Sequence, residues 1–258
     1  NAEHVFEAAP DLAGATGLQL EVLTDGDLFM NGPGRDGAWA IGRMKVQVKK
    51  PDAKDWEEVK LVNASADFSE PESTVPRPGA DPKKPAKSPA KQEDGPPPTI
   101  SIGPVANMID ADEQSAWRAD RGYLLKHQPS VAVVQFEKPL DYPAGTKLKI
   151  SLRWSSGAVS HSLQSMLGCC RLSLTKAPTP AALPIDHGAM LAARKPAAER
   201  TEADRGAIFS AWRKTIPEFG PFNDKIAASW AKAPHAPTTV MHAAPRSVAQ
   251  RRPTHLLD

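Results

Sequence analysis

The sequence predicts a mainly β protein: an antiparallel β-sandwich with a long proline-rich insertion and a small C-terminal helical extension. Several short segments alternate apolar and polar residues at period two, which indicates strands with one buried face. No helical pattern lies between these segments, and such chains form antiparallel sandwiches more readily than parallel sheets. After residue 176 the spacing becomes helical. We therefore expect a sandwich over residues 1–176, and a helical extension over 177–258 that links toward a following domain.

The strand predictions follow the chain in order. In residues 16–23, the side chains of Leu18, Leu20 and Val22 share one face, as a half-buried strand requires. Residues 131–136 form the most apolar segment. The same pattern predicts further strands over residues 40–48, 59–64, 148–152 and 170–174.

Residues 71–98 interrupt the strand pattern. They hold nine prolines and four lysines, and Val75 is their only branched aliphatic residue. Such a stretch buries too little apolar surface to offset its ordering entropy. The sequence therefore predicts a mobile, extended Pro/Lys-rich insertion in the sandwich.

The C-terminal extension carries two helical signals. Thr201 and Asp204 have the spacing of a capping box at the start of a helix. Further on, Phe219, Phe222, Ile226 and Trp230 form one apolar stripe at helical spacing. Two helices of this size have too little core to stand alone, so we expect these aromatic residues to pack on each other, on the sandwich or on sequence outside the chain.

Composition excludes several classes of protein. The formal charge of +2 argues against a nucleic-acid-binding protein, whose surface normally carries a clear basic excess. No apolar run approaches the roughly 18–20 residues that cross a bilayer, so no membrane span is expected. Two adjacent cysteines exclude a disulfide scaffold and a multi-cysteine zinc or heme motif. Because the chain starts at Asn1, we expect a processed product or a segment of a longer polypeptide.

The most specific segment is residues 105–120, which follow a small-residue strand at 63–69. Ile109, Asp110, Asp112, Ser115 and Trp117 hold the places of an apolar-Asp-x-Asp-x-x-Ser-x-Trp element. This pattern resembles the galactose-binding-like, discoidin-type jelly roll, which implies a jelly-roll arrangement of the sandwich. Trp117 is then expected to be structural and to cover one end of the core.

Asp110 and Asp112 allow two interpretations. Carboxylates and turn carbonyls suit a hard cation, so the pair is a candidate structural Ca²⁺ site. Aspartates also accept hydrogen bonds from backbone N–H groups in tight turns. Both alternatives stay open from the sequence.

A second resemblance covers nearly the whole chain. Six blocks occur in the order found in one region of the large planctomycete cytochrome c-linked multidomain proteins: residues 16–46, 63–69, 106–117, 160–175, 198–219 and 238–258. The resemblance implies an extracytoplasmic, non-catalytic module whose partners are the flanking domains or subunits. It also implies that heme c belongs to an upstream domain, because the chain lacks Cys-x-x-Cys-His. No cofactor is expected in this chain apart from the calcium alternative.

Loop residues supply the candidate ligand contacts. Aromatic and hydrogen-bonding side chains in loops suit carbohydrate, and the candidates are Arg35, Arg118, His127, Trp154 and His161. His161 lies in a polar loop that follows Trp154. Arg35, in a glycine-rich turn, either pairs locally or clamps an anionic group of a polysaccharide.

Cys169 and Cys170 lie inside a predicted strand, where alternation sends one thiol inward and the other outward. A disulfide between neighbours would strain the strand. The sequence predicts small apolar strand residues with a structural role, and a redox or metal pair is the alternative.

Three functions follow from these observations. The first, which we predict, is a non-catalytic binding or scaffold module that contacts carbohydrate through its loops. The second is a purely structural piece of a redox assembly. The third is a polysaccharide-acting enzyme that pairs Asp110 with Glu137 or Asp141, although no spacing in the sequence places these acids opposite one another.

Overall fold

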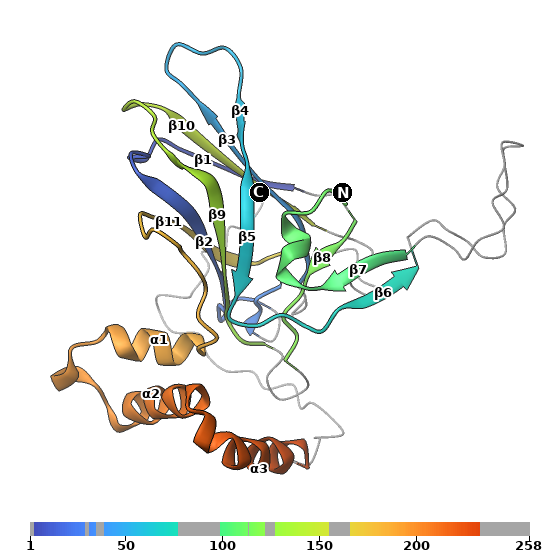
Figure 1. The fold of residues 1–258 in the computed structure, drawn as a ribbon, viewed down its shortest axis with the longest axis vertical. Helices are drawn as coiled ribbons and strands as arrows, with labels where there is room; N and C mark the ends of the chain where they lie inside the picture. Colours follow the sequence, from blue (N-terminus) through green and yellow to red (C-terminus); the bar gives the residue numbers. More distant parts are fainter. Residues whose placement is uncertain are drawn as a thin grey trace, which may run out of the picture. The chain divides into compact units, whose positions relative to one another are not determined.

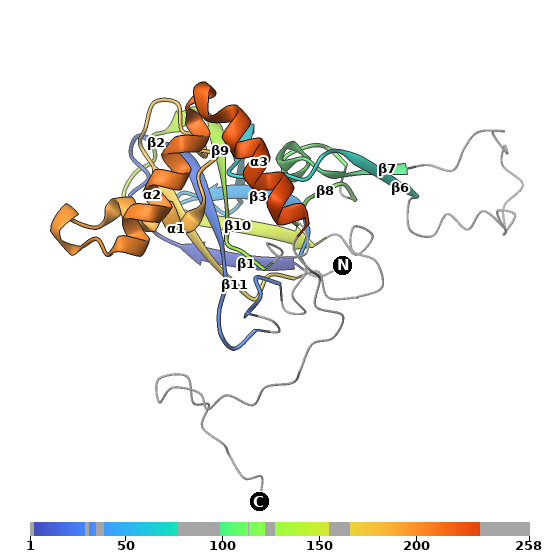
Figure 2. The same cartoon turned by 90° about the horizontal axis from the view of Figure 1, so that it is seen from below.

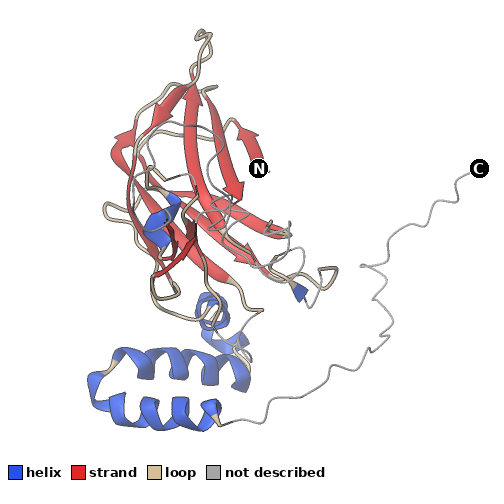
Figure 3. Ribbon diagram, turned by 90° about the vertical axis from the view of Figure 1, so that its right-hand side faces the viewer, coloured by secondary structure: helices blue, strands red, loops and turns tan. Residues whose placement is uncertain are grey.

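The computed structural model describes residues 3–28, 31–34, 39–76, 99–112, 114–121, 127–154 and 166–232. The chain divides into two compact units, one reaching Pro184 and the other starting at Ile185. The strands belong to the first unit, here called the β unit, and the three α-helices to the second, the helical unit (Figure 3). No helix in the described part of the chain is long and apolar enough to cross a membrane.

The β unit contains two sheets (Figure 1). The seven-stranded sheet has the order β1 (Glu3–Ala8), β10 (Lys147–Trp154), β3 (Ile41–Lys49), β8 (Ala116–Trp117), β7 (Thr99–Gly103) and β6 (Ser73–Pro76), with β4 (Glu57–Val59) also paired to β3. The four-stranded sheet has the order β11 (Cys169–Thr175), β2 (Ala15–Leu23), β9 (Ser130–Leu140) and β5 (Leu61–Ala66).

One hydrophobic core joins the two sheets. Alternation along β2 places Leu18, Leu20 and Val22 in this core, with at most 1% of each residue exposed. The same cluster takes its other members from both sheets, including β3, β9 and β10. This confirms the mainly β prediction. Pairing is antiparallel in every described strand pair except β7–β8, which is parallel.

The strand pattern missed β1, β6, β7 and β8, and its single strand over residues 59–64 did not separate β4 from β5. β1 lies at the edge of its sheet, and only its residues His4 and Phe6 are partly buried. Its sequence therefore shows little alternation of apolar and polar residues. β6 begins inside the stretch predicted as a mobile insertion, and Ser73–Pro76 instead pairs with β7. Proline is tolerated there because β6 is an edge strand. The rest of the predicted insertion, residues 77–98, lies outside the described residues.

The boundary between the units lies eight residues later than the sequence predicted, because residues 177–184 are attached to the four-stranded sheet. Gln135 Nε2 donates a hydrogen bond to the carbonyl of Pro180 at 2.9 Å. The backbone N–H of Ala182 donates to Ser65 Oγ at 2.8 Å. These bonds hold an extended segment that carries no strand pattern of its own.

The helical unit contains α1 (His187–Arg194), α2 (Glu202–Thr215) and α3 (Gly220–Ala231), with α1 packed against α2 (Figure 2). The predicted capping box is confirmed: Thr201 Oγ1 accepts from the Asp204 N–H at 3.2 Å, and Asp204 accepts from the Thr201 N–H at 2.9 Å. The sequence missed α1, whose buried residues are His187, Ala189 and Ala192 and give no strong apolar stripe.

The capping box makes α2 sensitive to acid. Hydrogen bonds from Lys195 and Thr201 lower the pKa of Asp204 to about 2. A carboxylate with a lowered pKa stabilises the folded state above its ordinary pKa, and the contribution disappears as the pH falls through the lowered value. We therefore expect the N-terminal turn of α2 to lose amide protection between about pH 4 and pH 2. NMR hydrogen exchange checks this, and Asp204→Asn should remove the pH dependence of that turn.

Candidate functional site

The turn at Asp110–Ser115 is held by its own side chains. Asp110 Oδ1 accepts from the Asp112 N–H at 3.0 Å, and Asp112 Oδ1 accepts from the Gln114 N–H at 3.0 Å. The Ser115 hydroxyl lies 2.8 and 2.9 Å from the two carboxylate oxygens of Asp110. Burial raises the pKa of Asp110, while the hydrogen bond from Ser115 opposes this rise. These contacts have the geometry of turn capping.

The calcium alternative needs more oxygen ligands than this pair supplies, because Ca²⁺ takes six to eight. Within the described residues, no group of three or more His, Cys, Asp or Glu side chains is placed to hold a metal ion. The carboxylates of Asp110 and Asp112 are also used by backbone N–H groups. The geometry therefore favours the turn interpretation of the two aspartates.

Trp117 lies in β8 and belongs to the hydrophobic core, with 0% of the residue exposed. Its ring meets Trp39 edge to face, with 4.8 Å between the ring centroids. The indole N–H donates to the carbonyl of Phe68 at 3.2 Å. Trp117 therefore joins the Asp110–Ser115 turn to the core and to the segment that follows β5.

Arg118 and His127 are both engaged in local contacts. Arg118 Nε lies 3.2 Å from Glu70 Oε1, and the Arg118 carbonyl accepts from the Glu70 N–H. His127 Nδ1 lies 2.9 Å from the carbonyl oxygen of Gly32. Both side chains therefore tie neighbouring segments together.

The structure corrects the predicted placement of Trp154. It is the last residue of β10 and is 3% exposed, because strand alternation turns its ring into the core. A buried ring is not available to stack on a sugar. Arg35 and His161 lie outside the described residues. Of the predicted ligand residues that the structure describes, Arg118 and His127 are partly exposed and Trp154 is buried.

Cys169 and Cys170 both have free thiols at the start of β11. They pair in register with Leu23 and Val22 of β2, so the strand is regular through the cysteine pair. Cys170 packs against the core, and burial raises the pKa of its thiol, with Cys169 adding to the rise. A raised pKa disfavours the thiolate, which is the reactive and metal-binding form. The arrangement fits small strand residues.

A buried ion pair that the sequence did not reveal joins Asp67 to Arg121. Arg121 Nη2 lies 2.7 Å from Asp67 Oδ2, and the two side chains are 10% and 2% exposed. Arg121 also donates to Ser130 Oγ at 2.8 Å and lies over the ring of Phe68. Burial raises the pKa of Asp67, while Arg121 and backbone N–H groups lower it. The partners are 54 residues apart, so no sequence spacing could have indicated the pair.

The helical unit leaves its predicted apolar stripe of Phe219, Phe222, Ile226 and Trp230 partly or largely exposed, and Phe209 and Trp212 of α2 extend it. We call Phe209, Trp212, Phe219, Phe222, Ile226 and Trp230 the aromatic face. Within it Trp230 is 65%, Phe222 59% and Phe209 54% exposed. Neighbouring rings are in contact from Phe209 through Trp212 and Phe219 to Phe222, with 5.7, 5.8 and 6.4 Å between centroids. α3 buries none of its residues.

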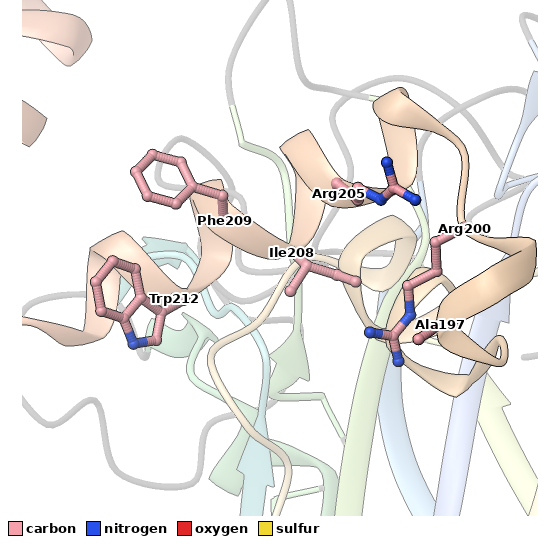
Figure 4. Close-up of a pocket in the computed structure, with 6 residues that line it drawn as sticks. All are labelled: Ala197, Arg200, Arg205, Ile208, Phe209 and Trp212. Atoms are coloured by element: carbon pink, nitrogen blue, oxygen red, sulfur yellow. The ribbon is translucent and has the colours of Figure 1, made fainter.

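A shallow groove of about 430 Å³ lies beside this face (Figure 4). Its lining residues are Ala197, Arg200, Arg205, Ile208, Phe209 and Trp212. Arg200 donates to the carbonyls of Ala193 and Lys195 and so holds the end of α1. Phe209 and Trp212 lie at one end of the groove and the two arginines at the other. The apolar end thereby continues the aromatic face, and the other end is cationic.

No family model, curated protein or solved structure matches the chain. The function is therefore argued from the arrangement of the chain's own residues. Of the surfaces described above, the aromatic face differs most in composition from an ordinary solvated surface. Exposed apolar patches of this kind mark interaction sites.

Proposed function

We propose that the chain is a non-catalytic binding and scaffold module whose helical unit docks onto another protein domain or subunit. The observation that carries this proposal is the aromatic face. Tryptophan and phenylalanine are enriched at the centres of protein interfaces and depleted from solvated surfaces. A protein partner that covers these rings would remove them from water.

The energetics of α3 support a protein partner. An isolated helix of 12 residues is marginal in water, and most helical stability comes from packing of the apolar face. α3 buries no residue, so packing of its apolar stripe contributes little to the stability of the helix. A partner would supply the missing packing, and Arg205 at the exposed end of the groove is placed to meet acidic groups at the rim.

The two resemblances noted in the sequence extend this proposal. They suggest that the β unit is a jelly roll, that the protein is extracytoplasmic, and that its partners are flanking domains of a cytochrome c-linked protein with heme c in one of them. A purely structural piece of a redox assembly is the narrower form of the same proposal. A structural Ca²⁺ at Asp110 and Asp112 is tested by a thermal shift, since an unchanged melting temperature with chelator removes it.

Site-specific photo-crosslinking in the native cells tests the proposal. Replacing Phe222 with photoreactive p-benzoylphenylalanine should give one discrete adduct with another protein segment. Asp224 is the matched control, because it lies two residues along α3 on the opposite side of the helix. No adduct at position 222, or the same adducts from both positions, would show that the aromatic face is not an interface.

A further inference from the structure

The seven-stranded sheet turns a row of cations away from the core. Along β10, Leu148, Ile150 and Leu152 are buried, so alternation directs the residues between them to the outer face. β3 follows the same rule, with Met44, Val46 and Val48 buried. We call the basic outward residues of these two strands the cationic face: Arg43, Lys45, Lys49, Lys147, Lys149 and Arg153.

The register places like charges opposite one another on this face. Lys49 is paired with Lys147 at one end, and Arg43 with Arg153 at the other. Like charges directly opposite in adjacent strands destabilise a sheet. Packing of the core does not require this arrangement, because the outward positions accept any polar residue. The Lys49–Lys147 pair is therefore available to a ligand that carries negative charge.

Acidic residues lie next to the cationic face but do not neutralise its positive charge. On β1, Glu3 pairs in register with Arg153, and Glu7 with Lys149. On β4, Glu58 is opposite the neutral Gln47. Within the described residues, no ion pair joins Lys45, Lys49 or Lys147 to an acid. Positive charge is therefore least compensated at the end of the face that holds Lys49 and Lys147.

An aromatic ring lies at this same end. Trp56 directly precedes β4, which pairs with β3, and the indole is partly exposed. Lys149 Nζ lies 4.2 Å from the centre of the Trp56 ring. Lysines and a partly exposed indole thus occur together, so the lysines can pair with anionic groups of a ligand while the indole packs against a ring of it.

We propose that the cationic face binds a linear anionic polysaccharide. Its sulfate or carboxylate groups would lie between Lys49 and Lys147, with a sugar ring packed on Trp56. From Arg43 to Lys49 the strand extends about 20 Å, enough for several consecutive sugar units. An anion bound between Lys49 and Lys147 offsets the repulsion between the two lysines. Binding of the ligand therefore removes an unfavourable interaction of the free protein. The site belongs to the β unit and is independent of the aromatic face.

Affinity electrophoresis of the whole chain in gels containing dextran sulfate, with neutral dextran as reference, tests this proposal. The wild-type chain should be retarded by dextran sulfate only. Lys49→Gln with Lys147→Gln should bind about fivefold more weakly, as expected for the loss of two exposed ion pairs. The same double variant should melt at an equal or higher temperature without ligand, because the like-charge pair is gone. Retained stability with lost binding separates this result from misfolding.

The control is Lys138→Gln with Lys232→Gln, which changes the net charge equally at exposed positions in β9 and directly after α3. Equal weakening by both double variants would overturn the proposal, because binding would then depend on net charge alone. Tighter binding to single-stranded DNA or to anionic vesicles than to dextran sulfate would also overturn it. Trp56→Ala should weaken binding as well, and unchanged binding would contradict the role given to the sugar ring.

Discussion

Replacing Trp117 with alanine is expected to lower the free energy of unfolding of the β unit by about 3–5 kcal/mol. The residue is fully buried, and its ring packs on Trp39. The truncation leaves a cavity and removes the hydrogen bond to the Phe68 carbonyl. Urea unfolding followed by near-ultraviolet circular dichroism measures the change.

Trp230→Ala is the matched control for this experiment. Its side chain is 65% exposed, so the same truncation should change the free energy of unfolding by less than about 0.5 kcal/mol. A small effect at Trp117, or equal effects at both positions, would contradict the placement of Trp117 in the core.

Arg121→Ala is expected to destabilise the β unit by about 3–5 kcal/mol, because it leaves the carboxylate of Asp67 buried without its partner. Removing both charges with Asp67→Asn in the same chain should recover part of this loss, as a double-mutant cycle would show. The cycle also requires the single variant Asp67→Asn, measured beside Arg121→Ala and the double variant.

The Arg121→Ala defect should also depend on pH. Burial already raises the pKa of Asp67, and loss of Arg121 raises it further. Protonation then neutralises the buried group, so the stability of the variant relative to wild type should improve as the pH falls below the raised pKa. A defect of less than about 1 kcal/mol, or one that stays constant with pH, would mean that the pair is not structural.

The sequence predicted those elements whose signal is local. The alternation around Leu18 and Leu20 identified β2, and the spacing of Thr201 and Asp204 identified the start of α2. β8 could not be predicted because it contains only Ala116 and Trp117, and its place depends on partners in β3 and β7.

The candidate sites depended even more on distant pairing. Trp154 was predicted as a ligand residue because a polar loop follows it in the sequence, yet its position at the end of β10 buries it. The cationic face could not be predicted, because only the β3–β10 register places Lys49 opposite Lys147. The Asp67–Arg121 pair likewise forms across 54 residues. In contrast, the aromatic stripe was visible in the sequence, and only its exposure required the structure.

The most direct test of the account is hydroxyl-radical footprinting of the helical unit in the purified chain and in the assembly isolated from native cells. Trp230 and Phe222 should be oxidised rapidly in the chain alone and protected several-fold in the assembly, while the buried Trp117 should react slowly in both. If Trp230 and Phe222 are equally reactive in both samples, or already protected in the chain alone, the aromatic face is not a docking surface.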